Sequence, residues 1–349
     1  MSAKEPFLRN AWYAVAFDFE VADKPLARRI CNEPMVIFRH SGGKVAVLSD
    51  RCPHRKAQLS SGQVVGDSIE CGYHGYRFDG DGACTLIPSG EIPPASFHAR
   101  AFPAIETYGF VWAWTGDPAL ADPAHIPDLS RNASPEWAAV RDYLHVEGNY
   151  QLLIDNLLDL THTYYVHRTT LAGPGVNENA LAVTVDGDVV RGERVMRNVD
   201  PAPIFRAALG VDGKIDRWQI VEYHPPILAV AILGAKPPGT VEKLDVPTHV
   251  VYSLLTPETE RSTHYFWSTV RCWGIDDPAV SKTYYDMTVV AFNEDVTMVE
   301  GQQRMIDDDP RGSALAYFSH DKAALEARRL LTRKMRAESQ PTPLEAAAR

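Results

Sequence analysis

Two short stretches, Cys52-Pro53-His54-Arg55 and Cys71-Gly72-Tyr73-His74-Gly75, each combine one cysteine with one histidine. Their ligand spacings are C-x-H and C-x2-H, and 16 residues separate the two pairs. A two-iron, two-sulfur cluster with mixed ligands needs two thiolates for one iron and two imidazoles for the other. The sequence therefore predicts that Cys52, His54, Cys71 and His74 hold such a cluster on the tips of two loops.

The same four residues have two other interpretations, a Cys2His2 zinc site and an unrelated set of buried side chains. A common zinc finger segregates its ligands as C-x2-C and H-x3-H, whereas each pair here mixes the two ligand types. This difference favours a [2Fe-2S] cluster of the Rieske type, in which the histidines raise the reduction potential above that of an all-cysteine cluster.

The whole chain has the size and composition of a globular protein with more than one domain. It has 349 residues, of which 45% are hydrophobic and 23% charged, and this length favours two domains. A net charge of −10 argues against binding to nucleic acid. No apolar run is long enough to span a bilayer, and Met1 to Asn10 lacks an apolar signal core. The five dispersed cysteines suit a reducing cytoplasm, where we expect the protein to be.

The pattern of strands and helices predicts an α+β protein with a β-rich first domain at 1–117 and a mixed second domain at 118–349. Short runs of β-branched and aromatic residues predict strands at 11–16, 35–39, 45–48 and 108–114. A proline-containing stretch at 118–135 indicates the boundary. In the second domain we expect helices at 150–160, 282–306 and 322–338, and strands at 183–195, 248–255 and 262–271.

A second metal site is indicated by His162 and His167. Residues five apart on a regular helix point about 140° apart, so the two imidazoles converge only if the helix ends or bulges between them. Two imidazoles and one carboxylate form the facial triad of non-haem iron(II) oxygenases. An isolated pair with this spacing is more often two hydrogen-bonded core residues. An upstream cluster that delivers single electrons needs an acceptor, which favours the iron site.

The carboxylate of this triad should come from the helix predicted at 282–306. An acid at an inward position is costly unless it is paired or bound to a cation. Periodicity does not choose between Glu294 and Asp295, because each is three or four residues from the flanking inward positions. The inward stripe that we predict consists of Tyr284, Met287, Ala291, Met298 and Met305.

Asp159 lies three residues before His162, so the two share a face if the helix continues. Its carboxylate could then accept a hydrogen bond from the imidazole and fix the tautomer of the ligand. The alternative is an acid on the helix surface. Asp155, one turn earlier, is the weaker candidate for the same role.

Together these motifs resemble the oxygenase components of Rieske non-haem iron oxygenases, and among them the vanillate O-demethylase group, which includes dicamba-type demethylases. The resemblance covers nearly the whole chain. It is carried by the two cluster motifs and by Arg9-Asn10-Ala11-Trp12-Tyr13, Asp155-Asn156-Leu157-Leu158-Asp159-Leu160-Thr161-His162, Tyr165-Val166-His167, Asn293-Glu294-Asp295, Asp216-Arg217-Trp218-Gln219-Ile220 and Leu255-Thr256-Pro257-Glu258.

The resemblance implies a role for each matching position. It makes Cys52, His54, Cys71 and His74 the cluster ligands, and it makes His162, His167 and Asp295 the iron ligands, in preference to Glu294. Asn156 and Asp159 become catalytic residues, with Asp159 bridging His162 to the cluster ligand His74 of a neighbouring subunit in a head-to-tail homotrimer. A Rieske domain followed by a helix-grip catalytic domain is the fold that it implies.

The implied reaction is O-demethylation of a methoxylated aromatic acid in the catabolism of lignin-derived aromatics. A separate flavin and iron-sulfur reductase would supply electrons from NAD(P)H, and O2 would be activated at the mononuclear iron. The positions that bind substrate in dicamba-type enzymes are Ala229, Ser253 and Asp286 here. They lack the expected polar and aromatic contacts, so we favour vanillate, which would yield protocatechuate and formaldehyde.

An aromatic acid needs a cationic or hydrogen-bonding anchor in a mostly apolar pocket, and Arg217, His224 and Arg271 are candidates. Each could equally be a surface charge or part of a structural ion pair. The alternative functions are action on another methoxybenzoate, on the methyl group of an arylsulfonate or on the aromatic ring. A Rieske electron carrier without catalytic iron and a redox-silent zinc protein are the alternatives from other classes.

Overall fold

The computed structural model describes residues 6–168, 171, 179, 181–202, 206, 213–239, 248–312 and 314–339. The chain forms two compact units, Met1–Asp128 with Thr256–Glu260 and Leu129–Leu255 with Arg261–Arg349. The first unit includes part of the proline-containing segment that the sequence assigned to the second domain. The indole Nε1 of Trp12 donates to the carbonyl of Asp122 at 2.8 Å, which holds this segment against the first unit.

Within the described residues, the first unit contains three small antiparallel sheets, as the sequence predicted for a β-rich domain. One sheet has the order β1 (Trp12–Phe17), β11 (Phe110–Trp114) and β10 (Ala104–Thr107). The second has the order β2 (Leu26–Ile30), β3 (Glu33–Arg39), β4 (Val45–Ser49) and β9 (Ala101–Phe102). The third has the order β5 (Gln63–Val65), β6 (Ser68–Glu70), β7 (Arg77–Asp79) and β8 (Cys84–Leu86).

One hydrophobic core cluster of the first unit is built from the second and third sheets. Buried side chains from both sheets form one cluster, which includes Val36, Phe38, Leu48, Ile69 and Phe78. Two of the predicted cluster ligands, Cys52 and Cys71, belong to the same group of buried residues. The apolar core therefore anchors the loops that present these ligands.

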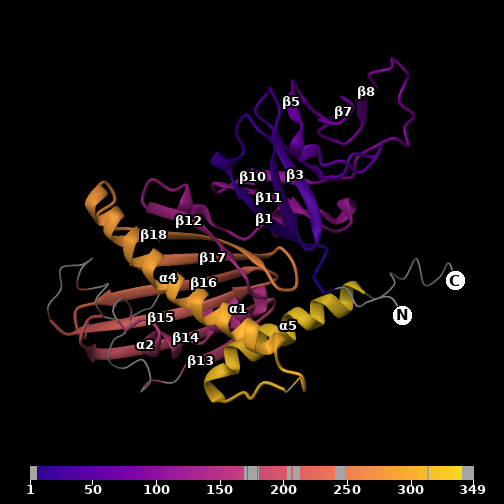
Figure 1. Ribbon diagram of the computed structural model, residues 1–349. Coiled ribbons are helices and arrows are strands. Elements are labelled where there is room, and N and C mark those ends of the chain that lie inside the picture. The colour runs from indigo at the N-terminus through magenta and orange to yellow at the C-terminus, as the bar shows by residue number, and fades with distance from the viewer. Residues whose placement is uncertain are drawn as a thin grey trace. The chain divides into compact units, whose positions relative to one another are not determined.

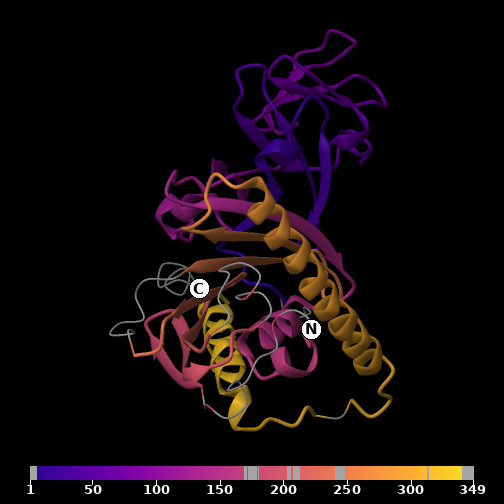
Figure 2. The same cartoon turned by 90° about the vertical axis from the view of Figure 1, so that its left-hand side faces the viewer.

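The second unit is built on a large antiparallel sheet, drawn in Figures 1 and 2 with helices lying on one face. Its seven described strands have the order β12-β18-β17-β16-β15-β14-β13. In chain order they are β12 (Ala138–Val146), β13 (Ala182–Asp186), β14 (Val189–Val199), β15 (Ile215–His224), β16 (Leu228–Lys236), β17 (His249–Pro257) and β18 (Thr263–Arg271). The helices are α1 (Tyr150–Leu158), α2 (His162–Tyr165), α4 (Pro278–Asp307) and α5 (Lys322–Glu338).

The helix predictions for α4 and α5 are confirmed, but the inward stripe of α4 differs from the prediction. α4 begins after Asp277, whose carboxylate accepts from the N–H groups of the first turn. Met298 and Met305 are 56% and 65% exposed, so their inward placement was wrong. The buried stripe instead follows the helical repeat through Tyr284, Thr288, Ala291, Phe292, Asp295, Val299 and Gln303.

The strand predictions for the second unit differ from the structure in two ways. The single strand predicted at 183–195 is a hairpin, because Gly187 with φ 53° turns the chain between β13 and β14. β12, β15 and β16 form strands that the sequence pattern did not predict. Of the helices in the described part of the chain, none is long and apolar enough to cross a membrane.

Gly234 provides a test of how β15 and β16 pack. It pairs with Trp218 across the two strands, and a Cβ at Gly234 would lie 1.8 Å from the indole Cζ2. We expect Gly234→Ala to lower the free energy of unfolding by about 1–3 kcal/mol, because the buried indole must move. Urea unfolding followed by tryptophan fluorescence measures this change. Gly42→Ala is the control, since a Cβ there meets nothing within 4 Å, and equal midpoints for both variants would contradict the packing.

Candidate functional site

The two loops that carry the Cys-His pairs have the same backbone design. In each loop the cysteine N–H donates to the carbonyl five residues on, and the cysteine carbonyl accepts from the N–H four residues on, at 2.8–2.9 Å. That fourth residue is left-handed in both loops, Lys56 with φ 62° and Gly75 with φ 73°. The two loops therefore present their ligands in matching conformations.

The four side chains fit the donor set of a [2Fe-2S] cluster. Cys52 and Cys71 are 1% and 2% exposed, and the rings of His54 and His74 lie 4.8 Å apart. Burial raises the pKa of the Cys52 thiol to about 11, backbone N–H groups oppose this rise, and the Cys71 thiol adds to it. The Nδ1 atom of His54 is buried and has no hydrogen-bond partner among the described residues. Two adjacent buried sulfurs and an imidazole nitrogen without a partner suit bound iron.

The second set of candidate ligands depends on a break between α1 and α2. α1 ends at Leu158, and Asp159 leaves the helical conformation with φ −93° and ψ 92°. α2 then begins at His162. This break, which the sequence analysis required, lets two imidazoles five residues apart turn towards one point.

His162, His167 and Asp295 converge on that point from two different parts of the second unit. The Nε2 atoms of the two histidines are 3.1 Å apart. The Asp295 Oδ1 atom lies 3.4 Å from Nε2 of His162 and 3.2 Å from Nε2 of His167. Ligands at about 2.1 Å from a metal and at right angles to each other lie about 3.0 Å apart. These three atoms can therefore occupy one face of an octahedral ion, as in the facial triad.

The outer nitrogen of each imidazole has its own partner. The backbone carbonyl of Asp159 accepts from Nδ1 of His162, and the Glu294 carboxylate accepts from Nδ1 of His167 at 2.8 Å. Protons on both Nδ1 atoms leave the Nε2 lone pairs for a metal. One interpretation of the sequence was a hydrogen bond from His162 to the carboxylate of Asp159. That carboxylate instead accepts from the N–H and hydroxyl of Thr161, because the helix has already ended.

Glu294 and Asn156 complete the surroundings of the triad. Periodicity left Glu294 and Asp295 as alternatives for one role, and the resemblance favoured Asp295 as the ligand. In the structure both carboxylates contact His167, through different nitrogens. Burial opposes a charge on His167, but these two acids outweigh it and raise its pKa. Nδ2 of Asn156 donates to Oδ1 of Asp295 at 3.1 Å. Asp155, the weaker candidate, pairs with Arg328 of α5 at 2.9 Å.

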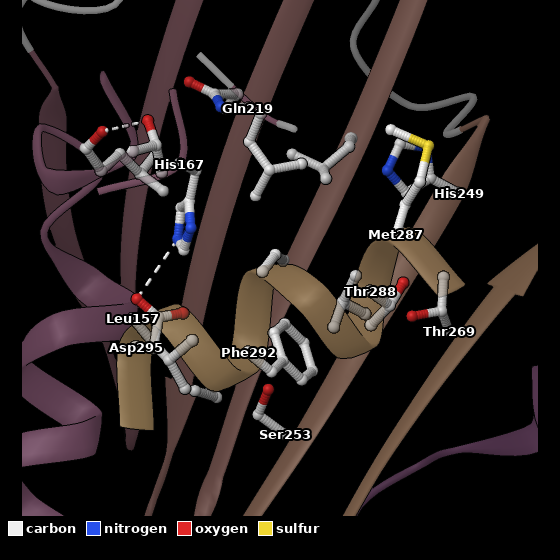
Figure 3. A pocket seen from close by; sticks show the side chains of 18 of the residues that line it. Leu157, His167, Gln219, His249, Ser253, Thr269, Met287, Thr288, Phe292 and Asp295 are labelled. Carbon is white, nitrogen blue, oxygen red and sulfur yellow. Dashed lines mark hydrogen bonds and ion pairs between the residues drawn. The ribbon is translucent and has the colours of Figure 1, made fainter. Parts of the chain in front are cut away.

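A cavity of about 110 Å³ opens from the triad between the sheet and α4. Its lining includes His162, His167 and Asp295, and most of the other lining residues are apolar. Figure 3 shows His167 and Asp295 at one end of this cavity, and His249 and Met287 at the other. The open positions of a metal at the triad would face this space.

The three predicted anchor residues lie in different places. Arg217 is 2% exposed and lines the cavity. His224 is a partly exposed neighbour of Glu222, with its Nε2 atom 3.2 Å from the carboxylate. Arg271 donates to the Gly274 carbonyl and the Ser281 hydroxyl at 2.9 Å and 2.7 Å, which supports the start of α4. His224 and Arg271 are not among the residues that line the cavity.

The positions compared with dicamba-type enzymes also separate in the structure. Ala229 and Ser253 pair across β16 and β17 and line the cavity. Ser253 and the Tyr265 hydroxyl are 2.9 Å apart. Asp286 instead points outwards on α4 and forms an ion pair with Lys282. The sequence pattern did not identify Gln219 or His249, which also line the cavity.

Comparison with known families covers both units. Residues 11–98 match the family model described as Rieske [2Fe-2S] domain. Residues 146–337 match the model described as vanillate O-demethylase oxygenase C-terminal domain. The Rieske domain and the catalytic domain predicted from the sequence are therefore both confirmed.

The relatives include enzymes named for different substrates. The chain is 36% identical to a vanillate O-demethylase oxygenase subunit of Pseudomonas sp. over 350 residues, which covers 96% of each chain. It is also 36% identical to the toluene-4-sulfonate monooxygenase system iron-sulfur subunit of Comamonas testosteroni, over 95% of this chain and 98% of that relative.

Crystal structures of dicamba monooxygenase have the same fold. The structure bound to 3,6-dichlorosalicylic acid is 35% identical with a TM-score of 0.90, over 96% of this chain and 99% of that one. A second crystal structure, which contains non-haem iron and dicamba, has a TM-score of 0.83 and 33% identity over 97% and 99% of the chains.

The contact between Glu294 and His167 predicts an effect on metal affinity. Loss of the carboxylate in Glu294→Ala should weaken binding of ferrous iron at the triad about 10- to 100-fold, because the ligand loses its orienting partner. Glu294→Gln, which keeps an acceptor oxygen, should lose less. Iron release to a chelator, with cluster absorbance as the internal reference, measures the change.

Asn293→Ala is the matched control for this measurement, since Asn293 is exposed and bonds to the carbonyl of Val289 in its own helix. A Glu294→Ala protein that releases iron as slowly as Asn293→Ala would show that the carboxylate does not support the ligand.

Proposed function

The chain belongs to the Rieske-type oxygenase components of the vanillate and dicamba O-demethylase family, and on that basis we propose that it O-demethylates a methoxylated aromatic acid, with vanillate as the favoured substrate. The observation that carries this proposal is a mostly apolar cavity with a candidate iron triad at one end and the buried cation Arg217 in its lining. A flat ring fits between apolar walls, and its acid group needs a positive partner.

We assign both metal sites to named residues. Cys52, His54, Cys71 and His74 would hold the [2Fe-2S] cluster, and His162, His167 and Asp295 the mononuclear iron. When bound, the cluster transfers single electrons and the iron activates O2. The overall change is ArOCH3 + O2 + 2 e⁻ + 2 H⁺ → ArOH + HCHO + H2O. One oxygen atom enters the methyl C–H bond, and the resulting hemiacetal breaks down to the phenol and formaldehyde.

The chain's own residues position the reacting groups. The carbonyl of Asp159 and the carboxylate of Glu294 hold the two imidazoles, and Asn156 holds Asp295. The apolar walls exclude water and place the methoxy carbon, rather than the ring, against the open side of the triad. Of the three anchor candidates, we propose Arg217 for the acid group, because His224 and Arg271 lie outside the cavity lining.

A separate electron donor follows from the way that the relatives are named, as subunits of multi-component systems. We propose a reductase with a flavin and an iron-sulfur centre that takes electrons from NAD(P)H. We further propose a homotrimer, in which Asp159 of one subunit bridges to the cluster ligand His74 of the next. Within one chain, the Asp159 carboxylate lies within 4.8 Å of ligand atoms of His320 and Asp321.

Oxidation of an arylsulfonate is the second candidate function. The identity to the toluene-4-sulfonate monooxygenase subunit equals the identity to the vanillate enzyme, at 36%. A sulfonate and a carboxylate are both anions that a buried guanidinium can bind. The two functions therefore share the candidate metal sites and differ in the group that undergoes oxidation.

Removal of one triad ligand should separate the two metal sites. His162→Ala should keep the colour and the electron paramagnetic resonance signal of the reduced cluster but lose the mononuclear iron, since only the triad loses a ligand. Iron and acid-labile sulfide should then become equimolar, and turnover should cease. His224→Ala is the control because His224 does not line the cavity. Full iron content in His162→Ala would remove the assignment.

A substrate panel tests the proposed reaction. With a compatible reductase and NADH, the protein should release formaldehyde from vanillate and from related methoxybenzoates, in a one-to-one ratio with the phenol. Toluene-4-sulfonate is included as the alternative substrate. Oxidation of the sulfonate without formaldehyde release from any methoxybenzoate would replace the first function with the second.

A further inference from the structure

Several polar side chains interrupt the mostly apolar lining of the cavity away from the candidate metal ligands. Three of them are Arg217, His249 and Thr269. Figure 3 shows His249 and Thr269 at the opposite end from His167 and Asp295. The ring of His249 contacts the hydroxyl of Tyr284 at 3.4 Å. Tyr284 precedes Asp295 by 11 residues of α4, about three helical turns, so both lie on the face of the helix that borders the cavity.

The register of the sheet places these side chains on the face that lines the cavity. Gln219 of β15 pairs with Leu233 of β16, which pairs with His249 of β17. Paired residues project from the same face, as do residues two apart on one strand. Arg217 is therefore on the same face as Gln219, and so is Arg194, which pairs with Gln219 from β14.

One of these side chains has a buried polar atom that needs a partner. Thr269 is 2% exposed, and its hydroxyl Oγ1 finds no hydrogen-bond partner within the described parts of the chain. A buried polar atom without a partner is unfavourable, and a native structure usually keeps one only where another molecule satisfies it. Thr269 lines the cavity, so a bound oxyanion can accept a hydrogen bond from this hydroxyl.

The charges of this end favour an anion. Burial, and then the nearby charge of Arg194, lowers the pKa of Arg217 to about 10, which still leaves the guanidinium charged at neutral pH. Burial, and then Arg217, lowers the pKa of His249 to about 3, so its imidazole is neutral. Burial lowers the pKa of Arg194, and the negative charge of Asp159 partly offsets this effect. A guanidinium with neutral hydrogen-bonding groups beside it matches an oxyanion.

We propose that Arg217, His249 and Thr269 form a subsite that binds the anionic oxyacid group of the substrate. This inference rests on the proposed function, because it orients the substrate with its acid away from the triad and its methyl group towards it. The subsite makes the charge of the substrate a condition for binding. Neutral analogues with the same ring and the same methoxy group should therefore be poor substrates.

Matched ligands and variants test the subsite. The ligands are 4-hydroxy-3-methoxybenzoate, the corresponding benzenesulfonate and 4-hydroxy-3-methoxybenzaldehyde, with affinities measured by calorimetry on the holoenzyme without reductase. Arg217→Met should weaken binding of the benzoate about tenfold to 100-fold, as expected when a hydrogen-bonded charge is lost. Thr269→Val, which keeps the size of the side chain, should weaken it about three- to tenfold. The aldehyde should change less than about threefold in each variant.

Leu233→Met is the matched control, because Leu233 lies between Gln219 and His249 in the same row of the sheet. It should change the affinities for acid and aldehyde by the same factor. Equal losses for acid and aldehyde in Thr269→Val would overturn the subsite, as would unchanged acid binding. A loss of affinity for both the sulfonate and the benzoate, but not for the aldehyde, would support a subsite for oxyanions in general. A loss of affinity for only one of the two acids would identify the acid group that the subsite prefers.

Formaldehyde release separates this inference from the proposed function. Demethylation with the same preference for acid over aldehyde in wild type and variants would leave the function standing and remove the subsite. Selective loss of benzoate affinity in a protein that demethylates nothing would support the subsite and remove the function.

Discussion

The organisation of the second unit depends on one carboxylate, Asp295, held 4% exposed between two imidazoles. A buried acid in this position is stable only with a cation or with hydrogen bonds to it. Its environment provides both possibilities, because Asn156 donates to it and two imidazole nitrogens converge beside it. The break after α1 and the length of α4 can both be understood as requirements of this convergence, since the ligands come from segments more than 120 residues apart.

The two histidines of the triad are supported in different ways, and this difference has chemical consequences. His162 bonds to a neutral backbone carbonyl, whereas His167 bonds to the carboxylate of Glu294. A charged acceptor makes an imidazole a stronger donor to a metal than a neutral one does. The two candidate nitrogen ligands are therefore not equivalent. His167, the more deeply buried of the two, receives the greater electrostatic support.

Local patterns predicted the parts of the fold that local chemistry determines. The Cys-His spacings, the helix at 322–338 and the acid at 294 or 295 all follow from nearest neighbours along the chain. β15 was not predicted from the sequence because its first seven residues are all buried, although they include Asp216, Arg217 and Gln219. A strand buried on both faces shows no alternation of apolar and polar residues. Charged residues within such a strand make it still harder to recognise from the sequence. Met298 and Met305 misled the prediction because apolar residues on a helix need not face the core.

The proposed metal ligands and the proposed subsite lie on different structural elements, and this separation would let one chemistry serve many substrates. The triad comes from α2, from the segment that follows α2 and from α4, whereas Arg217, His249 and Thr269 come from the strands of the sheet. A substitution on the cavity face of a strand can change which group is bound without moving a ligand of the metal. The two relatives at 36% identity are named for different substrates, a sulfonate and vanillate. The residues to compare when specificity is in question are therefore those of the sheet, not those of the triad.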